Sequence, residues 1–217
     1  MDTRDVALTV LLDIETNQTF SNIALGNALR KNQFTDKVER AFLSRLVEGV
    51  TETKLRLDYV IDQYSKTKIK KCKPVIACLL RMGCYQILFM DSVPDSAICN
   101  EAVKLAGKRG FVNLKGFVNG VLRNISRNLD KINYPDEKDK VSYLSVKYSL
   151  PEWLVKQWLN VYDEGTVKTI GSAFLEENPL TVRFNEHKIK KEDLVGILKK
   201  EGVTVGEVPE IPCALYL

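Results

Sequence analysis

The sequence predicts an all-α helical bundle followed by the start of an α+β subdomain. Through the first 130 residues, apolar side chains recur at helical spacing, and no strand-like alternation competes with them. A polar stretch that contains a proline, NLDKINYPDEKDKVS at 128–142, then interrupts the pattern. Beyond it, helical segments and short strand-like runs alternate, which indicates a β-α-β unit. We therefore expect a helical domain at 1–135, and linker helices with a partial α+β subdomain at 136–217.

The first four helices are expected from amphipathic faces between residues 6 and 64. Ser21 is a candidate N-cap of the second helix. Asp36, with Glu39 three residues later, forms a candidate capping box for the third. The four apolar faces are Val6, Ala7, Val10, Leu11 and Ile14; Ala24, Leu25, Ala28 and Leu29; Ala41, Phe42, Leu46, Val47 and Val50; and Leu57, Val60, Ile61 and Tyr64.

The helix expected at 74–90 is apolar on nearly all sides, as VIACLLRMGCYQILFM shows. Such a helix has no side that favours water, so we place it at the centre of the bundle. Pro74 suits its first turn, and Pro94 opens the next helix, which Gly110 can end. A further helix follows at 112–128. The connections are short, which is typical of a compact bundle.

After the polar stretch the pattern changes. Ser149 and Glu152 form a second candidate capping box before WLVKQWLNVY, and another helix runs through VKTIGSAFLEE to the Asn178–Pro179 break. LTVRF at 180–184 alternates like a strand, KKEDLVGILKKEG is an amphipathic helix that ends on Gly202, and VTVGEV is strand-like again. The last residues, IPCALYL, are apolar and strand-like, which suggests a fragment of a longer protein.

Composition argues against several classes of protein. Apolar residues make up 45% of the 217, which is enough for a core. No run of about 18 apolar residues predicts a membrane-spanning helix. The first residues carry acids and lack a small-residue cleavage site, so they do not resemble a signal peptide. We expect a cytoplasmic protein that makes no contact with a membrane.

The five cysteines are an odd number and include no C-x-x-C motif. We interpret them as small core residues in a reducing compartment, not as disulfides or zinc ligands. His187 has no Cys or His nearby, so no metal site is expected. Nothing beside Pro212–Cys213 would activate a nucleophilic thiol. The cysteines are Cys72, Cys78, Cys84, Cys99 and Cys213.

No motif of a catalytic site is present: G-x-G-x-x-G, the P-loop and H-E-x-x-H are all missing from the sequence. Arg81 stands inside the apolar helix, where an unpaired guanidinium would be very costly. Glu101 stands beside apolar residues in the next helix, so we predict a structural ion pair between Arg81 and Glu101. Glu101 has no second carboxylate in view that would favour acid–base catalysis.

Positive charge is concentrated in the middle of the chain. The formal net charge is −2 for residues 1–64, +9 for 65–131 and −3 for 132–217. This asymmetry favours a polyanionic partner, since Lys and Arg neutralise phosphates and Asn adds hydrogen-bond donors. A solvated charged surface is the alternative, above all for the run KTKIKKCK. The predicted RNA contacts are Lys66, Lys68, Lys70, Lys71, Lys73, Lys108, Arg109, Lys115, Asn119, Arg123 and Arg127.

Three long blocks resemble the hallmark blocks of a NusB-like domain: DKVERAFLSRLVEGV, LLRMGCYQILFMDSVPDSAICNEAVKLA and GFVNGVLRNISR. With the extension SLPEWLVKQWL…NPLTVRFN, the chain is similar to the bacterial family of ribosomal RNA small-subunit methyltransferase B, also called Sun or Fmu. This family methylates 16S ribosomal RNA at cytosine C5. The resemblance covers essentially the whole chain. It implies an all-α NusB-like RNA-binding domain, then a ferredoxin-like β-α-β subdomain that leads into an S-adenosylmethionine domain.

The resemblance implies part of an enzyme whose catalytic residues lie further along. The family's cofactor loop and catalytic cysteines match nothing in this chain, so we assign no catalytic residue and expect no activity from the chain alone. S-adenosylmethionine is the cofactor expected for the full-length protein, and 16S ribosomal RNA is the expected partner. The alternatives are a stand-alone NusB-type antitermination factor, which should end near 130–140, and a protein-binding scaffold, against which the basic middle segment argues.

Overall fold

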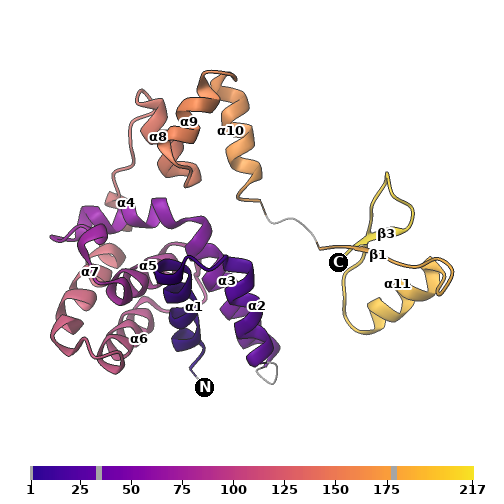
Figure 1. Ribbon diagram of the computed structural model, residues 1–217, viewed down its shortest axis with the longest axis horizontal. Coiled ribbons are helices and arrows are strands. Elements are labelled where there is room, and N and C mark those ends of the chain that lie inside the picture. Colours follow the sequence, from indigo (N-terminus) through magenta and orange to yellow (C-terminus); the bar gives the residue numbers. More distant parts are fainter. Residues whose placement is uncertain (1, 33–35, 177–179) are drawn as a thin grey trace. The chain divides into compact units, whose positions relative to one another are not determined.

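The computed structural model describes residues 2–32, 36–176 and 180–217 (Figure 1). It divides into two compact units, Met1–Phe174 and Leu175–Leu217. The Asn178–Pro179 break expected from the sequence lies outside the described residues. The domain boundary expected near residue 135 stays a prediction. The helices that follow it, up to Phe174, belong to the first compact unit.

The described residues of the first unit form helices and connecting loops but no strand, and one helix is surrounded by the others. Its elements are α1 (Thr3–Asn17), α2 (Ser21–Lys31), α3 (Lys37–Glu52), α4 (Lys54–Tyr64), η1 (Ile69–Lys71), α5 (Pro74–Phe89), α6 (Asp95–Lys108), η2 (Val112–Leu114), α7 (Lys115–Arg127), η3 (Leu129–Lys131), α8 (Lys140–Tyr148), α9 (Glu152–Leu159) and α10 (Glu164–Ala173). Every residue of α5 from Ile76 to Ile87 is buried, against α1, α3, α4, α6 and α7. The expected central helix is confirmed.

A glycine in α5 lets α7 pack closely on the centre of the bundle. The inner face of α7, made of Val118, Val121, Leu122 and Ile125, is buried. A Cβ atom at Gly83 would lie 2.6 Å from a methyl carbon of Leu122, which is closer than two carbon atoms can approach. Gly83 therefore sets how deeply α7 is seated.

The prolines and Gly110 lie where the sequence placed them. Pro74 is the first residue of α5, and Pro94 immediately precedes α6. Gly110 has a φ of 85°, a left-handed conformation that glycine adopts without strain, just after α6 ends. Elements that depend on the restricted or permissive backbone of one residue were thus predictable.

The side-chain caps expected at the second and third helices are wrong. Phe20 occupies the N-cap of α2, so Ser21 already lies inside the helix, where its hydroxyl is past the capping position. Asp36 does occupy the N-cap of α3, but its carboxylate accepts no hydrogen bond from the first turn.

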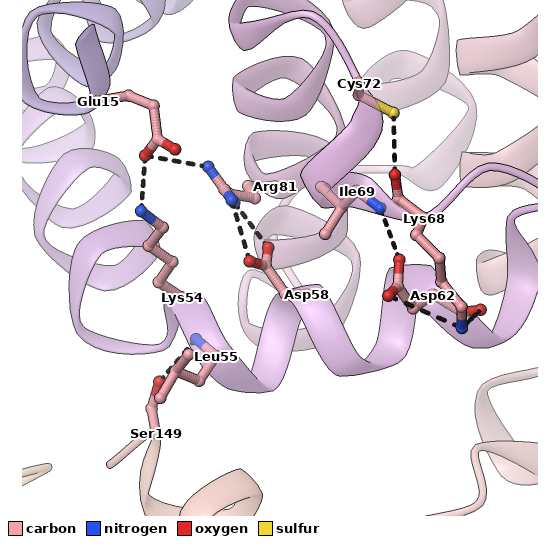
Figure 2. Close-up of polar contacts among 10 residues, drawn as sticks. All are labelled: Glu15, Lys54, Leu55, Asp58, Asp62, Lys68, Ile69, Cys72, Arg81 and Ser149. Carbon is pink, nitrogen blue, oxygen red and sulfur yellow. Dashed lines mark hydrogen bonds and ion pairs between the residues drawn. The ribbon is translucent and has the colours of Figure 1, made fainter. Parts of the chain in front are cut away.

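Ser149 also caps a helix, but not the one expected. It ends α8 in a left-handed conformation, with φ 54° and ψ 36°, and Pro151 occupies the N-cap of α9. Its hydroxyl oxygen accepts a hydrogen bond of 3.0 Å from the backbone N–H of Leu55, in the first turn of α4 (Figure 2). The predicted box of Ser149 with Glu152 is therefore wrong, because the side chain turns toward a distant helix.

The helices α8, α9 and α10 share a small core of their own. It consists of Leu144, Tyr148, Val155 and Val167, all buried. α8 also contacts α4, so this core is attached to the bundle through one helix pair. The segment 132–139, between η3 and α8, joins the two.

The second unit contains β1 (Thr181–Arg183), α11 (Lys191–Lys200), β2 (Gly206–Glu207) and β3 (Ala214–Tyr216). The three strands form one antiparallel sheet in the order β1-β3-β2, with Val182 opposite Leu215. Leu215 is fully buried, which explains the apolar sequence at the end of the chain. The strands and helix expected here are confirmed, and Gly202, with φ 79°, follows α11.

Candidate nucleic-acid interface

Four of the predicted RNA contacts lie in a line along α7. Lys115, Asn119, Arg123 and Arg127 follow one another at intervals of four residues, a spacing that returns to one side of an α-helix. The opposite side of α7 is buried in the core, so the line faces solvent, and both arginines are exposed. We call these four residues the α7 stripe. Their Cα atoms extend over about 18 Å of helix at 1.5 Å per residue.

The arginines of the α7 stripe keep their charge available. Neither Arg123 nor Arg127 forms an ion pair within the described parts of the chain. The Nε of Arg123 donates a hydrogen bond of 3.1 Å to the side-chain oxygen of Asn119, which aligns the guanidinium with the helix. The remaining N–H groups of Arg123 and the amide group of Asn119 stay available as donors toward solvent.

The loop 65–73, which we call the lysine loop, starts beside the end of α7. Tyr64, the residue before it, donates a hydrogen bond of 3.1 Å to the carbonyl oxygen of Asn128. Asp62 accepts a hydrogen bond of 2.7 Å from the backbone N–H of Ile69, whose side chain is buried (Figure 2). Asp62 also lies 3.8 Å from the ammonium of Lys68. Within this loop, the exposed lysines for which the described residues offer no ion pair are Lys66, Lys70, Lys71 and Lys73.

Lys108 and Arg109 were expected at phosphates, but the structure gives each a carboxylate partner. Lys108 Nζ lies 2.6 Å from Asp5 Oδ2, and Arg109 Nε donates to Asp5 Oδ1 at 2.9 Å. Burial would raise the pKa of Asp5, but hydrogen bonds from Lys108 and Arg109 outweigh it and hold that pKa below its ordinary value. Arg109 also donates to the hydroxyl of Thr9 at 2.7 Å. These contacts join the end of α6 to the start of α1.

Arg81 is bound by carboxylates of α1 and α4. Its Nε and Nη2 donate to the two carboxylate oxygens of Asp58 at 2.6 and 2.9 Å, and its Nη1 lies 3.2 Å from Glu15 Oε2. Lys54 donates to the same oxygen of Glu15 at 2.6 Å. The side chain of Arg81 is only 7% exposed, so these bonds are what make its burial tolerable. We call Glu15, Lys54, Asp58 and Arg81 the α4 network (Figure 2).

The predicted partner of Arg81 is therefore wrong, although its structural role is as expected. Glu101 lies in α6, where its side chain is 28% exposed, and pairs with Lys104 at 2.6 Å one turn later. Arg81 faces α4 and α1 instead, where Asp58 and Glu15 lie. Asp58 follows Leu57 directly, at the edge of the apolar face of α4, and that position was the missed signal.

Three cysteines are core residues, as expected. Cys78, Cys84 and Cys99 are buried; burial raises the pKa of Cys78 to about 11 and that of Cys84 further, so both thiols stay protonated. Cys72 and Cys213 are partly exposed. In the described ranges, no three His, Cys, Asp or Glu side chains gather as metal ligands would. None of the described helices is long and apolar enough to span a membrane.

Two family models match the chain. Residues 1–127 match the NusB family, and residues 150–217 match the Methyltr_RsmF/B-like ferredoxin-like domain. The chain is 35% identical over 202 residues to the probable ribosomal RNA small subunit methyltransferase B of Bacillus subtilis (strain 168). That alignment covers 93% of this chain and 44% of the relative, so the chain spans less than half of the relative's length.

Two solved structures share the fold. The crystal structure of PH0851 covers 99% of this chain and 48% of its own, with a TM-score of 0.68 at 17% identity. The structure of the antitermination factors NusB and NusE in complex with dsRNA covers 58% of this chain and 93% of its own, with a TM-score of 0.53 at 22% identity. The resemblance expected from the sequence blocks is confirmed: the chain belongs to the NusB family and continues into the ferredoxin-like domain of RsmF/B-like methyltransferases.

Proposed function

We propose that this chain is the RNA-binding N-terminal part of an S-adenosylmethionine-dependent 16S ribosomal RNA (cytosine-5) methyltransferase. The observation that carries the proposal is the α7 stripe, which ends beside the lysine loop and whose arginines have no ion pair in the described residues. The name of the Bacillus subtilis relative supports the substrate class. The NusB–NusE structure, which holds dsRNA, supports RNA as the kind of ligand for this fold.

Unpaired cations are the ones that bind phosphates most effectively. A lysine or arginine that neutralises a phosphate releases the cations condensed on the RNA, which favours binding. Lys68, Lys108 and Arg109 would first have to leave Asp62 or Asp5, so they contribute less. The proposed contacts are therefore Lys66, Lys70, Lys71, Lys73, Lys115, Asn119, Arg123 and Arg127.

The share of this chain in the reaction is binding and placement. A site for S-adenosylmethionine does not fit the described residues, because their sheet has three short antiparallel strands and no glycine-rich turn from a strand into a helix. We therefore derive no methyl-transfer step from these residues and expect none from the chain alone. A helical domain that holds nearby phosphates would position a folded RNA so that one base can leave its stack.

Antitermination is the second candidate function. The NusB–NusE structure supports it, but that structure corresponds to 58% of this chain. The methyltransferase-type ferredoxin-like domain at 150–217 favours the first proposal.

A salt titration tests the proposal. Fluorescence anisotropy of a labelled 16S rRNA fragment should give an affinity that falls steeply between about 50 and 200 mM salt, with a log–log slope of roughly −0.7 to −0.9 per phosphate contact. An affinity that does not depend on salt would exclude phosphate binding by this surface.

A double substitution then locates the contacts. Arg123→Ala with Arg127→Ala should weaken RNA binding about tenfold and make the salt slope shallower by about two, one for each cation removed. Circular dichroism should show unchanged helicity, because both side chains are exposed. The matched control, Lys199→Ala with Lys200→Ala in α11, removes the same charge elsewhere and should leave affinity nearly unchanged. Equal losses in both variants would contradict the assignment to α7.

A further inference from the structure

A second cationic site lies in the first unit, apart from the residues of the α7 stripe and the lysine loop. It is a cavity of about 230 Å³ between α4, the segment 132–139 and α8. Its lining contains two tyrosines, one proline and two cations, and no carboxylate: Arg56, Tyr134, Pro135, Tyr143 and Lys147. We call it the tyrosine pocket.

The segment that supplies Tyr134 is fixed to α4. Tyr59 donates a hydrogen bond of 3.1 Å to the carbonyl oxygen of Asn133, and the N–H of Asn133 donates to the side-chain oxygen of Gln63 at 3.0 Å. The guanidinium of Arg56 lies between two rings, 5.1 Å from the ring centre of Phe89 and 5.2 Å from that of Tyr134. Tyr134 is 36% exposed, so its ring is partly open to solvent while the Arg56 guanidinium lies over it.

The cations of the tyrosine pocket have positive charge that no carboxylate of the described residues balances. The Nη2 of Arg56 donates to the hydroxyl of Tyr134 at 3.4 Å, and its buried Nε has no hydrogen-bond partner among the described residues. The ammonium of Lys147 is exposed and donates to the hydroxyl of Tyr143 at 2.8 Å. That bond, more than the distant charge of Glu137, raises the pKa of Lys147, so the ammonium stays charged. Neither cation forms an ion pair within the described segments.

Flat ring faces beside unpaired cations suit one kind of ligand. A nucleotide offers an aromatic base, which stacks on tyrosine, and a phosphate, which binds Lys or Arg. The volume is below the roughly 300–1,000 Å³ of a pocket for a drug-sized molecule, so it accommodates one base and not a larger ligand. A base within a duplex is covered on both faces by its neighbours, so only an unstacked base can enter.

We propose that the tyrosine pocket binds a single unpaired nucleotide of the RNA, with the base on Tyr134 or Tyr143 and the phosphate at Lys147. This inference rests on the proposed RNA-binding function and adds to it a preference for RNA with unpaired residues. The α7 stripe contacts phosphates of any RNA, whereas the pocket distinguishes unpaired strands from duplexes.

Two RNAs separate the two surfaces. One is a blunt duplex of about 16 base pairs, and the other is the same duplex with a short unpaired uridine tail. The wild-type chain should bind the tailed RNA about tenfold more tightly, within the range expected for stacking of one base. The double variant Tyr134→Leu with Tyr143→Leu, which keeps apolar side chains but removes both flat rings, should abolish this preference and leave the affinity for the blunt duplex unchanged. Arg123→Ala with Arg127→Ala should weaken both RNAs and keep the preference.

The results distinguish failure of the pocket from failure of the proposed function. If the wild type binds both RNAs equally, or if the double tyrosine variant keeps the preference or weakens both RNAs alike, the pocket assignment is wrong while RNA binding stands. If the wild type binds neither RNA, both proposals are wrong.

A crosslinking measurement does not depend on any variant. With wild-type chain and a tail that carries 5-iodouridine, ultraviolet light should attach the RNA to Tyr134 or Tyr143, as mass spectrometry of the peptides would show. Crosslinks confined to other residues would also overturn the assignment.

Discussion

The α4 network and the α7 stripe use the same guanidinium group in opposite surroundings. Arg81 is 7% exposed and has two carboxylates within 3.2 Å, whereas Arg123 and Arg127 are exposed and pair with no acid in the described residues. Both sets lie on helices that pack against α5 or belong to it. What differs is the partner of the charge, and the partner decides whether an arginine stabilises the fold or is free to bind a ligand.

The comparison also explains why net charge alone is a poor guide to a binding surface. Lys108 and Arg109 belong to the basic middle segment, yet both pair with Asp5 in the first turn of α1. Their charge is used within the protein. Accordingly, substitutions in the α7 stripe should change RNA affinity, whereas substitutions in the α4 network should change the stability of the fold.

Arg81→Met should produce the largest change. It leaves Asp58 and part of Glu15 without their counter-charge in a mostly buried place, and breaking such a pair costs about 3–5 kcal/mol of the free energy of unfolding. Urea denaturation measures the loss. Arg123→Met is the matched control and should change stability by less than about 0.5 kcal/mol, as exposed substitutions do. If the two variants were equally stable, the distinction between the two regions would be lost.

Acid should weaken the α4 network before it affects the α7 stripe. Burial favours the neutral form of Glu15, but Lys54 and Arg81 hold its pKa below the ordinary 4.5. A carboxylate with a lowered pKa stabilises the fold above its unfolded-state pKa, and this contribution is lost as pH falls through the folded-state value. Between about pH 7 and pH 3, stability should therefore fall less steeply for Glu15→Gln than for the wild type. Identical slopes in urea denaturation at each pH would show that Glu15 does not contribute.

Ser149→Ala should have the smallest of the three effects on stability. It removes the acceptor for the N–H of Leu55 at the start of α4, which costs about 1 kcal/mol. Serine and alanine both carry a Cβ, so the left-handed backbone at this position disfavours them alike and the difference reports the hydroxyl. Ser92→Ala, at an exposed position, is the control for denaturation. A loss no larger than in the control would mean that solvent caps α4 equally well.

The parts of the fold that could be predicted depend on local sequence. The all-round apolar character of 75–90 predicted a central helix, and the intervals of four residues in α7 predicted that Arg123 and Arg127 share a side. Periodicity and proline positions are properties of one segment, so they can be recognised without knowing the neighbours.

The failures at Ser149, Arg109 and Arg81 involve partners that are distant in sequence. Ser149 accepts its hydrogen bond from a residue 94 positions away, and Arg109 pairs with an aspartate 104 positions away. Arg81 pairs with Asp58 and not with Glu101, because its side of α5 faces α4 and α1. How these helices pack cannot be derived from one segment of the sequence. Capping boxes and ion pairs are short-range interactions, but the fold decides which groups come within that range.

Gly83, a buried residue of α5, affects where the exposed cations of α7 lie. Because Gly83 has no side chain, Leu122 packs directly against the backbone of α5. This contact sets the distance between α5 and α7, and therefore the position of the α7 stripe. A methyl group added at Gly83 would displace α7, and with it the cations of the α7 stripe, without altering any charge.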